Sequence, residues 1–404
     1  MPSIGKPGSL KLSNRKAILN MLRNSGVLSV AELSQKAKLS KTTILKIFNY
    51  YVKEGLVLVA GKGESTDEGG KKPIMYEFNK RGGFVFACHI FPDALYSVIT
   101  DLDSSILSSR NTAIKENEGL NSVIENIVQS FNSLVNEENI PKNKIIGIAI
   151  GAHGITDYNN GVIIHSPHFQ SWGENVEFKN ILKEKLNSDI PIFIDNQIRF
   201  QVFAEKVKGT ARDKKNIIVI EGGAGLVAGI IVKDEIKRGA HNLAGEIGHM
   251  IINPNSDETC ACGVKGCFES MVTTRRLLRI AGESKEKYPD SLIFKNSGRN
   301  DISIGDIFRA SNQGDGLGKK IMDDAAGWYA IGLSNLVLTY DPDIIILHGI
   351  FIKAGDYFIK RLRERISNVS LVHVNMDTRI EYSKFGSEVG AIGAAAYVTS
   401  EYFK

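Results

Sequence analysis

The chain is poor in cysteine and tryptophan and has no long apolar run. Its 404 residues include 4 Cys, 2 Trp and 10 Pro. So few cysteines exclude a disulfide framework and are typical of a protein in a reducing cytoplasm. No stretch approaches the roughly 20 apolar residues that a membrane-spanning helix needs, and the N-terminus lacks an apolar signal core. We therefore expect a cytoplasmic protein without a membrane partner.

Positive charge is concentrated at one end of the sequence. Residues 1–80 carry 14 Lys and Arg against 6 Asp and Glu, a net charge of +8, whereas the remaining residues carry a net charge of −3. A chain of this length is expected to form two to three domains. A basic segment on a slightly acidic body indicates that an anionic polymer binds the segment alone.

The basic segment has the pattern of a helix-turn-helix domain. Residues 1–13 are rich in Pro, Gly and Ser, and a helical period begins after them and ends near Gly26. Ser29 and Glu32 fit a capping box that starts a second, short helix. Ser40 is expected to cap a third helix that runs to about Glu54. Three short helices with a tight turn indicate a DNA-binding domain.

A wing is expected after the third helix. Two short strands flank residues 61–73, which are basic and rich in glycine. Ile44, Leu45 and Ile47 of the third helix are expected to face the core of this domain. The N-terminal end of such a helix enters the major groove of double-stranded operator DNA. The residues expected to contact DNA are Ser40, Lys41, Thr42, Thr43, Lys46, Lys71 and Lys72.

The densest cluster of metal-ligand residues lies in residues 245–269. Cys260, Cys262 and Cys267 fall within eight residues, and His249 precedes them by about one loop. Three thiolates and one imidazole form a tetrahedral zinc site. Three cysteines this close cannot all pair with one another, and only one cysteine remains elsewhere. The spacing therefore predicts a bound Zn²⁺ with these four residues as its ligands.

This segment reads Gly-His, a ten-residue gap and then Cys-x-Cys-Gly-x-x-Gly-Cys-x-Glu. It resembles the signature of the ROK family of repressors, open reading frames and sugar kinases, and the likeness covers nearly the whole chain. Strands alternate with helices after residue 81, which favours an α/β architecture. The resemblance implies an α/β two-lobed actin-like (ribonuclease-H-like) ATPase fold behind an N-terminal winged helix-turn-helix domain.

The resemblance also implies a division into three domains. Residues 1–80 would form the winged helix-turn-helix domain. Residues 81–195 plus 385–404 would form the first α/β lobe of the ROK body, to which the C-terminal helix would return. Residues 196–384 would form the second α/β lobe, with the zinc site and a dimerisation surface.

The elements that a sugar kinase needs are degraded. Family kinases have an Asp-x-Gly-Gly-Thr turn in the first lobe, but the matching residues 88–93 contain no glycine. The second glycine-rich turn, residues 222–229, keeps much of its glycine. Gln197 falls where the family's catalytic aspartate belongs, and an amide cannot accept a proton at physiological pH. We therefore expect no catalytic residue and no enzymatic activity.

The sugar side of the site is better preserved. Asn196 and Gln197 can form hydrogen bonds with sugar hydroxyls, and by resemblance Glu246, His249 and Glu269 point at them. One alternative is that Glu246 and Glu269 only support the zinc site. The sequence as a whole predicts a sugar-responsive repressor that acts as a homodimer, possibly as a tetramer. Two rival functions are an active sugar kinase with a DNA-binding head and a DNA-binding dimer that senses no ligand.

Overall fold

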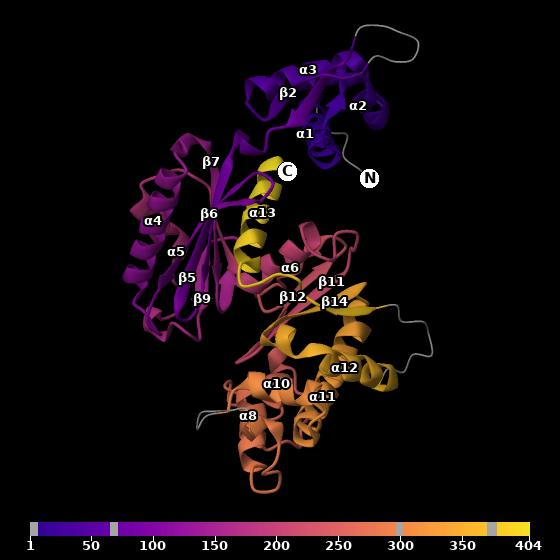
Figure 1. The fold of residues 1–404 in the computed structure, drawn as a ribbon. Helices are drawn as coiled ribbons and strands as arrows, with labels where there is room; N and C mark the ends of the chain where they lie inside the picture. Colours follow the sequence, from indigo (N-terminus) through magenta and orange to yellow (C-terminus); the bar gives the residue numbers. More distant parts are fainter. Residues whose placement is uncertain (1–6, 65–71, 296–301, 370–377) are drawn as a thin grey trace. The chain divides into compact units, whose positions relative to one another are not determined.

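The computed structural model describes residues 7–64, 72–295, 302–369 and 378–404 (Figure 1). The chain divides into two compact units. The first contains the residues up to Ile150, together with His168–Ile194 and Ala394–Lys404. The second contains Gly151–Pro167 and Asp195–Gly393. The division into three domains remains a prediction.

The N-terminal head of the first unit is built on three helices. They are α1 (Pro7–Ser25), α2 (Val30–Ala37) and α3 (Lys41–Lys53). The capping box is confirmed, because the Ser29 and Glu32 side chains each accept a hydrogen bond from the other residue's backbone N–H, at 3.2 and 2.7 Å. Helix α1 begins seven residues earlier than expected. The first turn of a helix tolerates Pro7, because its missing N–H would have no partner there.

The head also contains a small antiparallel sheet. Strands β1 (Leu28–Ser29), β3 (Ile74–Phe78) and β2 (Val57–Lys62) lie side by side in that order. The predicted wing lies between β2 and β3, and most of its tip falls outside the described residues. The core of the head includes two side chains from elsewhere in the first unit, Leu102 and Phe403. The rings of Phe78 and Phe403 meet edge to face with centroids 5.9 Å apart.

Two five-stranded sheets follow, one in each unit. The first has the order β10-β7-β4-β5-β6 and the second the order β13-β12-β11-β14-β15. If the strands of each sheet are numbered in chain order, both sheets have the strand order 3-2-1-4-5. The strands of the first sheet are β4 (Phe84–Ile90), β5 (Ala94–Asp101), β6 (Ile106–Ala113), β7 (Ile145–Ala152) and β10 (Ile192–Asn196). The strands of the second are β11 (Ile217–Gly222), β12 (Leu226–Val232), β13 (Glu235–Ile236), β14 (Ile344–Gly349) and β15 (Arg379–Tyr382).

Helices cover the first sheet. Helices α4 (Leu120–Glu137) and α5 (Phe178–Leu186) lie together beside its strands (Figure 1). The part of the C-terminal helix α13 (Val389–Phe403) that lies within Ala394–Lys404 belongs to this unit. A Cβ atom on Gly147 of β7 would lie 2.5 Å from Val398, so the absence of a side chain lets the helix approach the strand closely.

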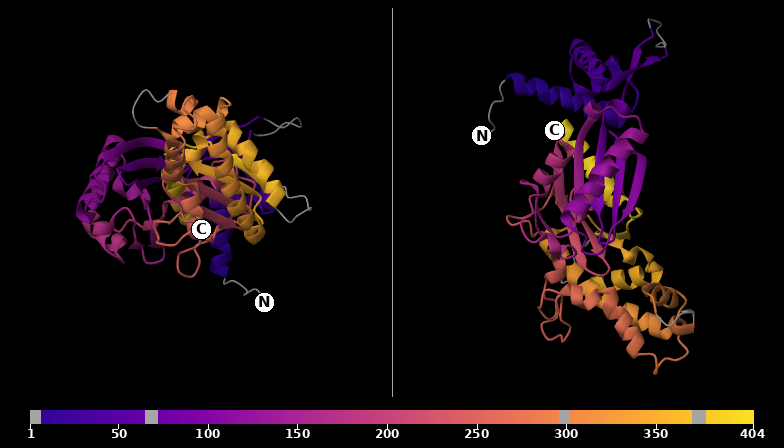
Figure 2. Two further views of the ribbon diagram at one scale, coloured as in Figure 1. Left: turned by 90° about the horizontal axis from the view of Figure 1, so that it is seen from below. Right: turned by 90° about the vertical axis from the view of Figure 1, so that its left-hand side faces the viewer.

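The second sheet is buried on both faces. Ile218, Ile220 and Leu347 face a large apolar cluster, whereas Val219 and Ile346 face helix α6 (Gln197–Val207). Continuous apolar runs are typical of strands covered on both sides. The helices that contribute to the large cluster are gathered in the orange and yellow part of Figure 2. They are α7 (Phe268–Val272), α8 (Thr274–Glu283), α9 (Leu292–Lys295), α10 (Ile304–Asn312), α11 (Gly316–Tyr340) and α12 (Gly355–Val369).

A two-stranded ribbon of β8 (Ile155–Asp157) and β9 (Val162–His165) completes the second unit. In the described part of the chain, no helix combines the length and the apolar character that crossing a membrane would require.

We predict that Phe403→Ala loosens the head although residue 403 lies far from it in the sequence. The Phe403 ring is 7 % exposed, and removing a buried aromatic ring costs about 3 kcal/mol. Backbone amides of α1 to α3 should then exchange with deuterium faster than in the wild type. The control is Lys404→Ala, because Lys404 is exposed and forms an ion pair with Glu401. Equal exchange in the head of both variants would contradict the prediction.

Candidate functional site

His249 and three cysteines of the second unit form a cluster that could hold a metal ion. One ligand atom from each of His249, Cys260, Cys262 and Cys267 lies within 4.8 Å of the others. The His249 Nδ1 atom is 3.6 Å from the Cys260 Sγ atom, and the Cys262 and Cys267 Sγ atoms are 3.7 Å apart. Tetrahedral zinc with bonds of about 2.1 Å to nitrogen and 2.3 Å to sulfur places such atoms about 3.6 and 3.8 Å apart. The four side chains therefore fit a tetrahedral ion.

Glycine makes the loop that carries the cysteines possible. Gly266 has φ +74°, and a Cβ atom there would lie 1.8 Å from the Asn253 carbonyl oxygen. The Gly266 carbonyl also accepts a hydrogen bond from the Ile252 backbone N–H at 2.9 Å. Gly263 has φ +84°, and its N–H donates to the Cys260 carbonyl at 2.9 Å. These left-handed turns reverse the chain tightly enough for the three thiols to converge.

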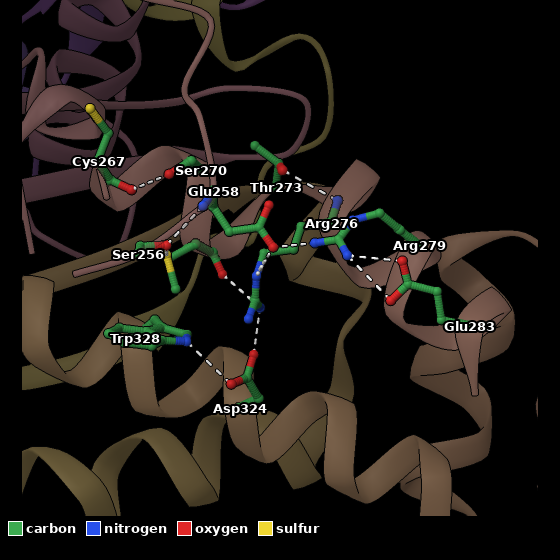
Figure 3. A network of polar contacts seen from close by, with 11 residues as sticks. Ser256, Glu258, Cys267, Ser270, Thr273, Arg276, Arg279, Glu283, Asp324 and Trp328 are labelled. Carbon is green, nitrogen blue, oxygen red and sulfur yellow. Dashed lines mark hydrogen bonds and ion pairs between the residues drawn. The ribbon is translucent and has the colours of Figure 1, made fainter. Parts of the chain in front are cut away.

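A polar network fastens this loop to the helices beside it (Figure 3). Arg276 of α8 donates from NH1 to Asp324 Oδ2 at 2.5 Å and to the Met271 carbonyl at 3.1 Å. Its Nε atom lies 3.5 Å from the Glu258 carboxylate in the loop. Trp328 Nε1 donates to Asp324 Oδ1 at 3.2 Å. The loop is thus tied through one guanidinium group to both α8 and α11.

Glu246 has the most available carboxylate of the predicted sugar-binding residues. It precedes the short helix η4 (Ile247–His249), and none of the described residues forms a hydrogen bond with its carboxylate. Burial raises the pKa of the Glu246 carboxyl, and the charges of His249, Arg199 and Glu269 lie near enough to act on it. A half-buried carboxylate without a protein donor can accept hydrogen bonds from hydroxyl groups of a ligand.

Two other predicted sugar-binding residues lie at the metal cluster. His249 is exposed, and its Nδ1 atom faces Cys260, which leaves Nε2 for a second partner. Glu269 Oε2 accepts a hydrogen bond from the Leu226 backbone N–H at 2.9 Å, and Oε1 lies 3.5 Å from the Cys260 Sγ atom. Glu269 therefore joins the metal loop to the turn before β12, so that one carboxylate oxygen is already engaged by the protein.

Asn196 and Gln197 are buried where β10 meets α6. The Asn196 side chain caps α6 by accepting from the Ile198 N–H at 3.0 Å and donates to the Gly154 carbonyl at 2.8 Å. Gln197 Nε2 donates to Glu221 Oε2 at 3.0 Å. Gln201 Nε2 donates to the same oxygen at 3.0 Å, and burial raises the pKa of the Glu221 carboxyl. No sequence motif points to Glu221 or Gln201, because Glu221 lies 24 residues from Gln197 and 20 residues from Gln201.

Asp195, immediately before this pair, is fully engaged. Its side chain is buried, and Oδ1 accepts from Arg199 NH1 at 2.7 Å and from the Asn196 N–H at 2.8 Å. Oδ2 accepts from Arg238 Nε at 2.8 Å. Arg199 also donates from NH2 to the Asn242 carbonyl at 2.6 Å. Two guanidinium groups thus occupy the Asp195 carboxylate, so that it is not a free base.

Close packing explains two glycines of the second turn, Gly222 and Gly229, and also Gly349 at the end of β14. Gly222 and Gly349 are register partners on β11 and β14. A Cβ on Gly222 would lie 2.3 Å from the Tyr329 hydroxyl, and one on Gly349 would lie 2.4 Å from the Gly222 carbonyl. A Cβ on Gly229 of β12 would lie 2.3 Å from the Ile198 carbonyl of α6. Close contacts within the second unit account for these three glycines without a phosphate.

In the first unit, five of the seven candidate DNA-binding residues lie at or near the start of α3. Lys41, Thr42 and Lys46 of α3 are exposed. Ser40 caps the helix by accepting from the Thr43 N–H at 3.2 Å, and Thr43 itself is half-buried. Ser40 and Lys72 are exposed, whereas Lys71 lies outside the described residues.

The expectation for Leu45 is wrong. Ile44 and Ile47 face the core of the head as predicted, but the Leu45 side chain is 42 % exposed. Ile44, Ile47, Phe48 and Tyr51 already form the buried stripe of α3, and Leu45 lies at its edge. A single helical turn cannot direct Ile44, Leu45 and Ile47 toward the same face, because adjacent residues point in different directions.

Comparison with known proteins decides the family. A family model described as "ROK family" matches residues 93–401. The chain belongs to the ROK family. The ROK match begins after the head, within the first sheet.

Among ROK relatives, regulators match the head and the body together. A xylose repressor of Caldicellulosiruptor bescii is 26 % identical over 398 residues, with 98 % of each chain covered. A crystal structure described as a ROK family transcriptional regulator, homolog of the E. coli MLC protein, has a TM-score of 0.83 at 21 % identity. It covers 98 % of this chain and 97 % of its own. The expected two-lobed actin-like fold with a winged helix-turn-helix head is confirmed.

A ROK glucokinase matches the body alone. The crystal structure of a glucokinase from Streptomyces griseus with glucose and AMPPNP has a TM-score of 0.64 at 23 % identity. It covers 78 % of this chain and 99 % of its own. The ROK body of this chain therefore has the fold of a sugar kinase, and the head is additional.

Proposed function

We propose that this chain is a repressor whose ROK body senses a sugar and whose winged helix-turn-helix head binds operator DNA. The observation that carries the proposal is the exposed basic N-terminal end of α3, with Lys41 and Lys46, on a head of net charge +8. Relatives named xylose repressor extend over 98 % of this chain, which makes xylose the first sugar to test. Affinity for DNA should fall steeply with salt, since each lysine at a phosphate releases counterions.

We also propose that the metal is zinc and that its role is structural. Zinc prefers thiolate and imidazole ligands, and four protein ligands close the coordination sphere. When bound, the ion supplies a rigid anchor that holds the loop of residues 249–267 in one conformation. His249 would then bind the metal through Nδ1 and present Nε2 to a ligand. Three reduced thiols fit the reducing cytoplasm in which we place the protein.

The sugar would bind beside this anchor. Glu246, with its unengaged carboxylate, would accept hydrogen bonds from sugar hydroxyls, and His249 and Glu269 would complete the contact. Asn196 and Gln197 would contribute less direct contact, since both amides are held by the protein. Two carboxylates repel a phosphate group, so an unphosphorylated sugar or short oligosaccharide is favoured.

We infer that the ROK body does not phosphorylate the sugar. Gln197 stands at the position of the general base, and its amide is bound to Glu221. Asp195 is occupied by Arg199 and Arg238. A kinase with a DNA-binding head would need a free carboxylate near the sugar, and Glu246 is the remaining candidate.

The active form would be a homodimer. Two basic heads on a symmetric body would bind a near-palindromic operator with higher affinity than one head, because the second binding event is intramolecular. Ligand binding would change the separation of the heads and so release the operator or bind it more tightly.

The sugar proposal predicts that Glu246→Ala abolishes the response to sugar. The variant should keep its metal and bind operator as the wild type does, because Glu246 lies outside both sites. The measurement is fluorescence anisotropy of labelled operator during titration with xylose and a panel of other sugars. Glu235→Ala, at an exposed position of β13, is the matched control. An unchanged sugar response in Glu246→Ala would contradict the proposed pocket.

The zinc proposal predicts one zinc ion per chain in protein purified without chelator. Cys262→Ser should lose most of the metal, because a serine hydroxyl is a poor ligand at neutral pH, and should weaken the sugar response as the loop loosens. Metal content would be measured by inductively coupled plasma mass spectrometry. The fourth cysteine, Cys88, is buried in β4, so Cys88→Ala serves as the control that should retain zinc. Wild-type protein with far less than one zinc per chain would refute the assignment.

Catalytic inactivity predicts no ADP release above background with any sugar that affects operator binding. A coupled pyruvate kinase and lactate dehydrogenase assay at millimolar ATP and Mg²⁺ would measure it. Restoring the carboxylate in Gln197→Asp tests whether the missing base is the sole defect. Wild-type turnover that disappears in Glu246→Ala would show that Glu246 is a working base and that the body is an enzyme.

A further inference from the structure

Helix α3 presents one outward face that the buried stripe leaves free. Thr42, Leu45, Lys46 and Asn49 are all exposed. They are spaced i, i+3, i+4 and i+7, so they follow one another along the same side of the helix. The buried side of α3 consists of Ile44, Ile47, Phe48 and Tyr51.

Leu45 is the unexpected member of this face. Its apolar side chain is 42 % exposed in the middle of a polar surface with Thr42 and Lys46 beside it. Tyr50 on the same helix is also exposed, but the Arg15 guanidinium covers its ring at 4.1 Å. Leu45 thus offers an apolar contact on the side of α3 that points away from the head's own core.

The hydroxyl groups at the start of α3 are engaged with one another. Thr43 Oγ1 lies 2.8 Å from Ser40 Oγ, and Thr42 Oγ1 lies 2.9 Å from the same atom. Because Ser40 also accepts from the Thr43 N–H, this group forms the helix cap. These hydroxyl groups already have partners in the cap, so side chains farther along the exposed face are more available to the bases.

We propose that Leu45 and Asn49 are the residues that select the operator sequence. This inference rests on the proposed function of the head as a DNA-binding domain. In the major groove, thymine presents a C5-methyl group and adenine presents N7 and its N6 amino group. An exposed leucine suits the methyl group, and an exposed asparagine can form two hydrogen bonds with adenine. Lys41 and Lys46 supply charge for the phosphates on either side.

The geometry of α3 also sets the spacing of the two bases. Leu45 and Asn49 are four residues apart, which is about 6 Å along a helix axis. Successive bases on one strand are about 3.4 Å apart. A thymine contacted by Leu45 and an adenine contacted by Asn49 should therefore lie about two base-pair steps apart in each half-site.

The test begins by selecting high-affinity duplexes from a random pool with the full-length wild-type protein. Single functional groups of the bases in the selected half-site are then removed one at a time. Replacing thymine by uracil removes only the methyl group, and replacing adenine by 7-deazaadenine removes only the N7 acceptor. Uracil at one position should lower the affinity of the wild type about fourfold, which corresponds to the burial of one methyl group. At one other position, 7-deazaadenine should lower it about tenfold.

The variants connect each base to its residue. Leu45→Ala should bind the thymine and uracil duplexes equally, and Asn49→Ala should bind the adenine and 7-deazaadenine duplexes equally. The matched controls are Val27→Ala, an exposed apolar residue outside α3, and Gln35→Ala, an exposed amide on α2. Both controls should keep the wild-type sensitivity to each modified base. Head folding is checked in every variant by circular dichroism.

The outcomes separate this inference from the proposed function. If a selected operator binds tightly but Leu45→Ala and Asn49→Ala remain as sensitive to the modified bases as the wild type, other residues read the sequence and the inference is wrong. If no sequence is enriched by the wild-type protein at any salt concentration, the head is not a sequence-specific DNA-binding domain and both proposals fail.

Discussion

The buried carboxylate of Asp195 and its two guanidinium partners hold together the part of the second unit that carries the candidate pocket. Arg199 connects Asp195 to the Asn242 carbonyl, and Arg238 reaches it from beyond β13 while its guanidinium stacks on Tyr158 at 4.0 Å. Removing one partner of a buried ion pair typically costs about 3–5 kcal/mol, because the other charge stays buried. The start of α6 and the loop before Glu246 therefore depend on one charge cluster.

The ROK body has the fold of a sugar kinase, and packing alone explains three of its glycines. Gly222, Gly229 and Gly349 lie where strands and helices of the second unit pack too closely for a side chain. Gln197 has a hydrogen-bonding partner in Glu221, so its amide nitrogen is satisfied. The metal cluster and the Glu246 carboxylate lie in the same unit. In our proposal, the ROK body holds a ligand without transferring a phosphoryl group to it.

Local sequence signals were sufficient to predict some helices and the metal cluster, but they did not predict the contacts between distant elements. The capping box of α2 and the glycine-flanked cysteines act over a few residues, so the head helices and the metal cluster could be predicted. The start of α1 was predicted too late because residues 1–13 are rich in Pro, Gly and Ser. Proline is nevertheless compatible with the first turn of a helix. The burial of Leu45 was predicted wrongly because the apolar pattern of a helix does not show whether a residue at the edge of the apolar stripe is buried or exposed. The pairing of Gln197 with Glu221 depends on how β11 packs against α6, which no short motif encodes.

The place of Phe403 in the head has a consequence for how the protein is made. The ribosome synthesises α1, α2 and α3 first, and N-terminal domains usually fold during synthesis. Here the ring that packs against Phe78 is added hundreds of residues later, after both sheets have been translated. The nascent head thus lacks part of its core until the body has been made. A chain that stalls or is cleaved before residue 403 leaves a weakened head, which favours its clearance.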